Sequence, residues 1–532
     1  AGVLILMISQ VFIKLLGLIY KLYLTNRKGF GDEGNAIYSS GYQIYALLLT
    51  LSSVGVPNAI AKLISEKLAV GNEKEAFRIF KIAFATFAII GFVCSSVMFL
   101  GAGYISNVIL QIPESELTLV ALSPAIFFVT IASVLRGYFN GRDKISVTAK
   151  AQTLEQIFKT VLTIAVVEIV VVLYGKNVTV MAAGANLATT LSVLLSFAYM
   201  ALYYKVYKKT IKVENSVSYK IEKASQVVKK ILFVSVPITL SAIMSTLNKN
   251  IDSITVVRGL KKFLTEGEAK LQYGILSGKV DTLITLPLSF NVAFATALVP
   301  SISAAIAKKE TASAQKRISL SLLVTMIIGL PCTFGMMVFA QPIINLLFPN
   351  ATNGALLLQI SSLTIIFSVL AQTVNGALQG LGRIMVPAVS SFIGLLIKLV
   401  LNILLIQISG IGVNGAAVGS IVNNFIVFAI SYYILSRTIK LDIKPVKFVI
   451  KPIFATTIMC ITSYYLYILL SGTITSTKIT TILSLLFAVI IYLLSIIALK
   501  IFTKEELRMI PYGNKLCKML ERLGIYGKEE IQ

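Results

Sequence analysis

Two passages of this sequence repeat each other, and they decide how the chain folds. The first, "VLRGYFNGRDKISVTAKAQTLEQIFKTVLTI", covers residues 134–164, and the second, "TVNGALQGLGRIMVPAVSSFIGLLIKLVLNI", covers residues 373–403. A shift of 239 positions brings three pairs of residues into register: Gly137 with Gly376, Gly141 with Gly380, and Lys159 with Lys398. The duplication indicates two copies of one structural unit, each of which places a lysine inside an apolar stretch.

The repeat extends beyond these passages. "VGVPNAIAKLIS" at residues 54–65 aligns with "TALVPSISAAIA" at residues 296–307, with an offset of 243. Both segments close the second apolar span of their half. We therefore expect spans 1–6 and spans 7–12 to be two copies of a six-helix unit. Because six is even, each copy enters and leaves on one side, so the copies are parallel and related by a pseudo-two-fold axis along the membrane normal.

The composition assigns the chain to the membrane. Hydrophobic residues make up 56% of the 532 residues and charged residues only 13%, whereas soluble domains are about half apolar and a quarter charged. Apolar runs of about 20 residues, long enough to cross a bilayer as helices, recur throughout. Alternating barrel-type strands are absent from the sequence, which leaves helices as the spanning element. The sequence predicts an all-α polytopic membrane protein with about 14 transmembrane helices, two six-helix lobes and two extra helices.

The positive charges indicate the topology. With the N-terminus inside, 34 of the 48 Lys and Arg residues fall in cytoplasmic segments and 8 on the opposite side. This asymmetry follows the positive-inside rule. The net charge of +25 therefore indicates anionic lipids at the cytoplasmic face as partners and excludes nucleic acid. Both termini are predicted to be cytoplasmic.

The predicted domains follow from the repeat and the charge pattern. Five segments are expected: an N-terminal lobe at 1–207, a cytoplasmic linker at 208–230, a C-terminal lobe at 231–438, two further spans at 439–502, and a cytoplasmic amphipathic tail at 503–532. The tail begins with Thr503 and Glu506, which are spaced as a capping box. We expect it to lie on the membrane surface.

The sequence contains no set of residues that indicates catalysis. It has no histidine and four widely separated cysteines, so neither a histidine relay nor a typical zinc site is predicted. A nucleotide-binding loop such as GxxxxGK[ST] is also absent. The chain is therefore predicted not to be an enzyme and to need no cofactor. Energy for transport must come from an ion gradient, with Na⁺ or H⁺ as the coupling ion, from the membrane potential or from the cargo gradient.

Ten charged residues lie inside the predicted spans. A charge at the bilayer centre costs about 2.5–3.5 kcal/mol on insertion scales, so each needs a partner, a wet cavity or an interface. The ten are the bases Lys14, Lys21, Lys159, Lys249, Lys279 and Lys398, and the acids Glu155, Glu168, Asp252 and Asp281. Because bases outnumber acids, we expect a positively charged chamber.

Helical spacing predicts which of these residues face that chamber. Lys14 and Lys21 lie on one polar stripe of the first span, and polar stripes on apolar helices turn inward. Lysine binds phosphate groups well as a point charge, so the chamber suits an anionic cargo. The candidate substrate contacts are Lys14, Lys21, Asn248, Lys249, Lys279 and Tyr42.

The remaining charges have alternative interpretations. Glu155 stands four residues before Lys159, the favourable order for an ion pair within a helix. Lys398 has no nearby acid in sequence, so a partner on another helix and exposure to the cavity are both open. Asp252 is either a counter-charge to Lys249 or Lys279 or a carboxylate that exchanges its partner for a coupling cation. Asp281 is a further candidate for coupling or counter-charge.

The sequence resembles a known group of transporters. The features that carry the resemblance are six plus six plus two spans, "LRGYFNG" after the fourth span, "ATALVPSIS" after the eighth and "NGALQGLGR" after the tenth. Together they are similar to the polysaccharide transport and stage V sporulation protein B family of the multidrug/oligosaccharidyl-lipid/polysaccharide (MOP) exporter superfamily. MurJ-type lipid II flippases are close to this family, and the resemblance covers essentially the whole chain. Lys14, Gly17 and Asp281 match positions of the flippase motif, whereas Tyr20 and Thr282 depart from it.

The resemblance implies a function and a fold. It implies a monomeric V-shaped, two-lobed MATE-like carrier in the bacterial plasma membrane that works by alternating access. Its cargo would be a lipid-linked anionic oligosaccharide, undecaprenyl-pyrophosphate carrying cell-wall sugar and peptide, turned from the inner to the outer leaflet. The two last spans would form a groove for the lipid tail. Rival interpretations are export of another lipid-linked glycan, such as a teichoic or capsular unit, ion-coupled drug export, and a non-transporting partner that recruits synthases.

Overall fold

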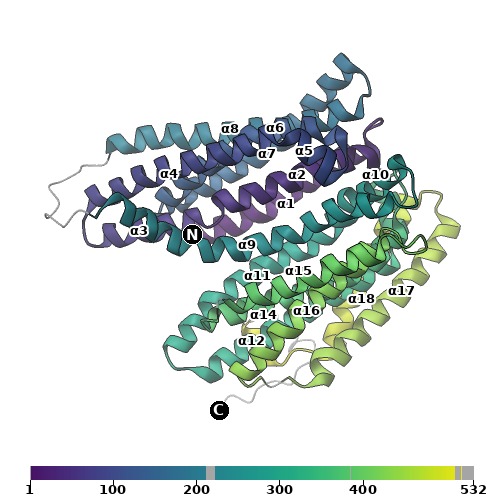
Figure 1. Ribbon diagram of the computed structural model, residues 1–532. Coiled ribbons are helices and arrows are strands. Elements are labelled where there is room, and N and C mark those ends of the chain that lie inside the picture. Colours follow the sequence, from purple (N-terminus) through teal and green to yellow (C-terminus); the bar gives the residue numbers. More distant parts are fainter. Residues whose placement is uncertain (1, 211–221, 384, 442, 510–516, 518–532) are drawn as a thin grey trace, which may run out of the picture. The chain divides into compact units, whose positions relative to one another are not determined.

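The computed structural model describes residues 2–210, 222–383, 385–441, 443–509 and 517. Within these ranges all regular elements are helical (Figure 1). The elements of the first half are α1 (Gly2–Asn26), α2 (Gly31–Ser53), α3 (Val56–Ala69), α4 (Glu73–Leu100), α5 (Ala102–Tyr104), η1 (Ile105–Leu110), η2 (Pro113–Ser115), α6 (Glu116–Gly141), α7 (Ile145–Tyr174) and α8 (Val178–Thr210). Those of the second half are α9 (Ala224–Leu260), α10 (Glu266–Gly274), η3 (Ile275–Val280), α11 (Asp281–Ala307), α12 (Thr311–Val338), α13 (Ala340–Leu347), α14 (Ala355–Gly380), α15 (Met385–Leu405), α16 (Asn414–Thr438), η4 (Val446–Ile450), α17 (Lys451–Thr473), α18 (Thr477–Ala498) and α19 (Lys504–Met509).

The helices confirm the predicted class, a multi-pass all-α membrane protein. Among the described residues, 11 helical segments are long and apolar enough to cross a bilayer, or up to 12 when the two halves of α9 are counted as one span. Those halves, Ala224–Leu240 and Ala242–Leu260, are bent by 43°. The expected number of 14 spans stays a prediction.

The chain divides into two compact units. Unit 1 contains Ala1–Leu286 and Ser391–Asn423, and unit 2 contains Pro287–Ser390 and Asn424–Gln532. This division groups the part of α15 that carries Lys398 with the N-terminal helices, which the repeat pattern did not indicate. The predicted domain boundaries describe a duplication rather than compactness, and they stay a prediction.

Unit 1 is built on long helices that pack side by side. α7 lies along α8 and α1, and α6 packs against α8, α4 and α3 (Figure 1). The glycines of the first repeat passage explain the close α6–α3 contact. A Cβ atom at Gly137 would lie 2.8 Å from the Ile60 Cβ and 3.0 Å from the Pro57 carbonyl oxygen. Only a glycine lets the two backbones approach this closely without displacement.

Unit 2 repeats this packing device. A Cβ atom at Gly380 of α14 would lie 2.9 Å from the Ile302 Cβ and 3.1 Å from the Val299 carbonyl oxygen of α11. In both units, then, a glycine of the repeated passage packs against a carbonyl and against the isoleucine three residues further along. In the 239-residue register Gly380 pairs with Gly141, where an added Cβ atom would lie 2.8 Å from the Ala61 carbonyl oxygen and 3.0 Å from the Ile64 Cβ. The register-matched glycines therefore also pack against a carbonyl and against the isoleucine three residues further along.

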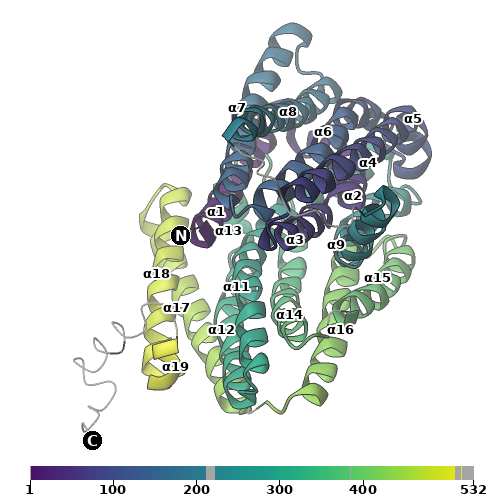
Figure 2. The ribbon, with the colours of Figure 1, turned by 90° about the vertical axis from the view of Figure 1, so that its left-hand side faces the viewer.

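The last two long helices belong to unit 2 and form a hairpin. α17 packs on α18 and on α12, as Figure 2 shows for the α17–α18 pair. The Tyr492 hydroxyl of α18 donates to the Ile327 carbonyl of α12 at 2.7 Å. At one end of the hairpin, Lys447 donates to both carboxylate oxygens of Glu506, at 2.5 and 2.6 Å. Glu506 also accepts from the Thr503 backbone N–H, and its own N–H donates to the Thr503 hydroxyl, so the predicted capping box is present.

Candidate functional site

Lys398 lies at the centre of a buried polar cluster in unit 1. Its side chain has no exposed surface, and its ammonium donates to Asp252 Oδ2 at 2.6 Å. It also donates to the side-chain oxygen of Asn248 at 2.7 Å and to the Asn248 carbonyl at 2.8 Å. An ammonium has three N–H donors, and these three contacts use them all. The open question about Lys398 is thereby answered, because its partner is an acid on another helix.

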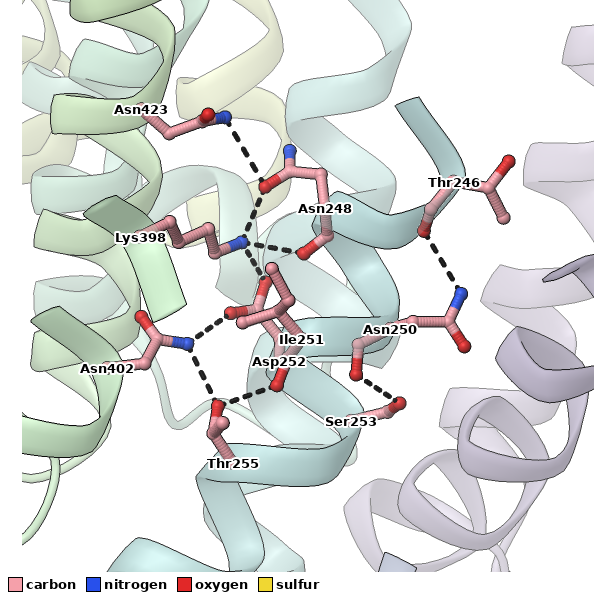
Figure 3. Close-up of polar contacts among 10 residues, drawn as sticks. All are labelled: Thr246, Asn248, Asn250, Ile251, Asp252, Ser253, Thr255, Lys398, Asn402 and Asn423. Carbon is pink, nitrogen blue, oxygen red and sulfur yellow. Dashed lines mark hydrogen bonds and ion pairs between the residues drawn. The ribbon is translucent and has the colours of Figure 1, made fainter. Parts of the chain in front are cut away.

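Asparagine side chains complete this cluster (Figure 3). Asn402, one turn after Lys398 on α15, donates to Asp252 Oδ1 and to the Thr255 hydroxyl, both at 2.9 Å. Asn423 of α16 donates to the Asn248 side-chain oxygen at 3.5 Å. We call Asn248, Asp252, Thr255, Lys398, Asn402 and Asn423 the ammonium cluster. It ties α9 to α15 and α16.

The pairing of Asp252 corrects one expectation. Lys249 and Lys279 were the expected counter-charges because they lie near Asp252 in sequence or on a predicted cavity face. In the structure Asp252 instead forms its ion pair with Lys398. Helical periodicity predicts the face on which a residue lies, but it does not predict which helix packs against that face. A buried ion pair offsets its desolvation cost only when its remaining hydrogen bonds are also made. The ammonium cluster makes them.

A second lysine group lies among tyrosines of unit 1. On α2 the rings of Tyr38 and Tyr42 are stacked, with centroids 5.8 Å apart, and Tyr45 follows at 5.5 Å from Tyr42. This spacing of four and three residues places the three rings on one face of the helix. The lysines Lys21 and Lys159 reach this face from α1 and α7.

Each of these lysines contacts aromatic faces. The Lys159 ammonium lies 4.5 Å from the Tyr42 ring centroid and 5.2 Å from that of Tyr20. The Lys21 ammonium lies 4.5 Å from the Tyr38 centroid. These distances are within the range of cation–π attraction. We call Tyr20, Lys21, Tyr38, Tyr42 and Lys159 the lysine–tyrosine cluster.

The polar contacts of the lysine–tyrosine cluster are weak. Lys159 donates to the Tyr42 hydroxyl at 3.5 Å, and Lys21 to the Ser39 hydroxyl at 3.5 Å. Among the described residues, no carboxylate lies within ion-pair distance of Lys21 or Lys159. Lys159 is buried. A buried charge that only rings and hydroxyls compensate leaves part of its desolvation cost unmet.

Glu155 corrects a further expectation. Its carboxylate accepts from Arg136 of α6 at 2.9 Å, whereas the sequence favoured Lys159 four residues on. Arg136 lies in the first repeated passage, at residues 134–164. Because Arg136 takes the carboxylate, Lys159 remains with the tyrosines. Glu168, expected near an interface, accepts from Tyr23 and from Arg27, the latter at 2.7 Å.

Three more predicted residues lie around the lysine–tyrosine cluster. Lys249 and Asp281 are half-buried and, with Lys159, lie within electrostatic range of Lys21. Lys14, seven residues before Lys21 on α1, is exposed. The structure therefore brings Lys249 and Asp281 near the cluster, whereas Lys14 is placed only as an exposed residue of α1.

Lys279 has a partner that sequence reasoning missed. It is fully buried in the π-helical turn η3 and donates to Asp32 of α2 at 2.9 Å. Beside it, a Cβ atom at Gly278 would clash with the Asn35 side chain, and one at Gly274 with the Asp32 carbonyl. Asp32 lies six residues before Tyr38, in the first turn of α2. The sequence signal that could have found it is its place in the first turn of a long apolar helix.

Side chains that commonly ligate metal ions do not gather in the described part of the chain. No group of three or more His, Cys, Asp or Glu side chains there could hold a metal ion. The arrangement consists instead of fixed charges on membrane helices. One such charge, Lys398, is fully paired, and two, Lys21 and Lys159, contact rings and hydroxyls.

Comparison with known proteins identifies the family. Residues 1–306 match the family described as polysaccharide biosynthesis protein, and residues 278–404 match the MatE family. The first match covers more than half of the chain, so the chain belongs to the polysaccharide biosynthesis protein family. Stage V sporulation protein B of Bacillus subtilis (strain 168) is 26% identical over 518 residues, covering 97% of this chain and 98% of that protein. Lipid II flippase MurJ of the same organism is 22% identical over 428 residues, covering 76% of this chain and 77% of that protein.

Solved structures share the fold. A lipid II flippase MurJ in an inward closed conformation has a TM-score of 0.70 and 16% identity, over 92% of this chain and 98% of that one. An inward-facing multidrug resistance MATE family transporter of the MOP superfamily has a TM-score of 0.66 and 14% identity, over 81% and 98%. The family match and the curated relatives confirm the resemblance predicted from the sequence. One of these relatives is named a flippase, and the two solved structures are named a flippase and a transporter, in agreement with the prediction that the chain is not an enzyme.

Proposed function

We propose that this protein is a flippase for a lipid-linked anionic cell-wall precursor. The observation that carries the proposal is the lysine–tyrosine cluster, where Lys21 and Lys159 contact rings and hydroxyls. A diphosphate group brought to these lysines would supply the missing counter-charge through charge-assisted hydrogen bonds. The tyrosine faces would flank the sugar portion of the cargo. The relative named lipid II flippase MurJ supports undecaprenyl-pyrophosphate-linked lipid II as the cargo.

The remaining features of the proposed carrier follow from the charge pattern. The basic segments face the cytoplasm of a bacterial cell, both termini included, and contact anionic lipids there. The protein works as a monomer, and Na⁺ or H⁺ is the candidate coupling ion. Residues of the wider predicted site, Lys14, Asn248, Lys249 and Asp281, would guide or counterbalance the head group. A cationic drug is a poor fit because the charged residues near the cluster are mostly bases.

A reconstitution assay tests this function. Purified protein in liposomes is supplied with fluorescent lipid II, and dithionite quenching reports transfer between leaflets. A charge-assisted hydrogen bond is worth about 1.5–3 kcal/mol, so Lys21→Gln and Lys159→Gln should each weaken cargo binding roughly 10- to 150-fold. Lys81→Gln is the matched control, because Lys81 is exposed and also lies over a ring, 4.8 Å from the Phe77 centroid. Unchanged flipping by the Lys21→Gln, Lys159→Gln double variant would overturn the proposal.

We further propose that contacts between α2 and η3 form the gate on the side opposite the basic segments. Lys279–Asp32 is the central pair, and Lys270–Glu114 at 2.5 Å lies at the same end of unit 1. Alternating access requires such contacts to break when the carrier opens outward. Replacing Asp32 and Lys279 by cysteine and cross-linking them should stop flipping, and reduction should restore it. Full flipping by the cross-linked protein would contradict this gate.

A further inference from the structure

The ammonium cluster has the composition of a cation site. A carboxylate, an amide oxygen and a main-chain carbonyl surround the Lys398 nitrogen at 2.6–2.8 Å. Hard cations take oxygen ligands of these three kinds. The cluster holds a single carboxylate, so one positive charge balances it and a divalent ion would leave a surplus. Its chemistry therefore fits a monovalent cation.

Further oxygens in the cluster lack donors. The side-chain oxygens of Asn402 and Asn423 are buried and have no hydrogen-bond partner among the described residues. Asn402 is 1% exposed and Asn423 5%. Buried amide oxygens are nearly always paired, so two unpaired ones in one cluster are unusual. The cluster therefore holds more buried oxygen acceptors than its own N–H and O–H donors satisfy.

Helices α15 and α16 pack closely at the ammonium cluster. Gly419 of α16 faces the Asn402 side-chain oxygen and the Lys398 stem, and a Cβ atom at Gly419 would clash with that oxygen. α16 therefore lies directly over the α15 residues. The Lys398 ammonium opposes entry of a second cation because like charges repel.

We propose that the ammonium cluster is a monovalent-cation site that the chain fills with its own lysine. The Lys398 ammonium takes the place that a bound cation would have. The contacts that it makes between α9, α15 and α16 therefore need no ion from solution. Lys398 is also the specificity-determining residue, since its ammonium excludes Na⁺ and K⁺ from Asp252. This assignment does not rest on the proposed cargo. It removes Asp252 from the candidates for ion coupling and makes it a fixed counter-charge.

Thermal unfolding in detergent with different salts tests this assignment. At equal ionic strength, the melting temperature of the native protein should be the same in choline, Na⁺, K⁺ and ammonium chlorides. Lys398→Ala opens the site and should lower the melting temperature in choline chloride. One or more of the small cations should raise it again by about 3 °C or more, with saturable dependence, because a ligand that binds only the folded state stabilises it.

Two further variants keep the test decisive. Asp252→Asn combined with Lys398→Ala should abolish the cation response, which shows that the ion binds at the cluster. Asp252→Asn combined with Lys398→Met removes both charges at similar volume and should fold with no cation response. If Lys398→Ala folds and melts at one temperature in all four salts, the assignment is wrong. It is also wrong if Na⁺ or K⁺ stabilises the native protein and Asp252→Asn removes that effect, because the site would then be open. Should Lys398→Ala fail to fold in every salt, small cations cannot replace the lysine and the assignment also fails.

Discussion

Lys159 and Lys398 occupy equivalent positions in the two repeated passages, yet their surroundings differ. Lys398 is held by one carboxylate and two oxygens of Asn248. Lys159 is held by tyrosine faces and a long contact to one hydroxyl. Lys398 therefore forms a buried ion pair that connects helices. Lys159, its counterpart in the other copy, has a positive charge that its contacts compensate only in part.

The difference originates in the helix that each lysine meets. Lys398 packs against the seventh predicted span, where Asp252 supplies the acid. With the repeat offsets of 239 to 243, the matching stretch of the first span is "SQVFI" at residues 9–13, which contains no acid. Duplication preserved the lysine, and divergence of the partner helix decided its role. An equivalent position in a repeat therefore does not imply an equivalent function.

The stability of lysine-to-methionine variants gives the largest expected contrast. Lys398→Met leaves Asp252 buried without its counter-charge and should cost about 3–5 kcal/mol. Lys159→Met removes a charge that has no carboxylate partner, so its cost should be below about 1.5 kcal/mol or reversed in sign. Thermal unfolding of both variants in one detergent measures the contrast. Equal losses would show that the two lysines are held alike.

Glycine substitution tests where the two copies agree. Gly141→Ala and Gly380→Ala place a Cβ atom 3.0 and 2.9 Å from an isoleucine Cβ, and overpacking of this kind costs about 1–3 kcal/mol. Both variants should melt at lower temperature by similar amounts. Gly472→Ala is the control, because nothing lies within 4 Å of its added Cβ. A loss in one copy alone would contradict a shared packing device.

Substitution of Tyr42 sharpens the description of the Lys159 environment and has the smallest expected effect. Tyr42→Phe keeps the ring 4.5 Å from the ammonium and loses only a 3.5 Å hydroxyl contact, so the change should stay below about 0.5 kcal/mol. Tyr42→Leu removes the ring and should cost roughly 0.5–2 kcal/mol of cation–π attraction in addition to packing. The two variants are compared by thermal unfolding. A larger loss for phenylalanine than for leucine would contradict a ring-based contact.

Much of the fold was predictable because it depends on local and compositional properties. The apolar runs predicted membrane helices, and these predictions are confirmed for the 11 or 12 spans found among the described residues. The polar face of α2 with Tyr38, Tyr42 and Tyr45 also follows from helical spacing. The π-helical turn η3 was not predicted, since such turns depend on packing against neighbouring helices.

The sequence predicted which charged residues belong to the candidate site, but it did not predict which of them form ion pairs with each other. Spacing identified Lys21, Lys159 and Lys398 as charges that need an explanation. Helical spacing predicted an ion pair between Glu155 and Lys159, whereas the structure pairs Glu155 with Arg136. A favourable distance along one helix is worth only about 0.2–0.5 kcal/mol. A cross-helix pair with better geometry and deeper burial outweighs it.

The sequence by itself determined the class of protein, the internal repeat, and the excess of bases within the predicted spans. These follow from composition, periodicity and internal repetition, which need no knowledge of what packs where. Only the tertiary structure decided that Lys398 meets Asp252, 146 residues away, and that Lys279 meets Asp32, 247 residues away. Hydrogen bonds and ion pairs in an apolar interior require contact at about 3 Å. Periodicity fixes the face on which a charge lies, but the packing of distant helices fixes which charge it meets.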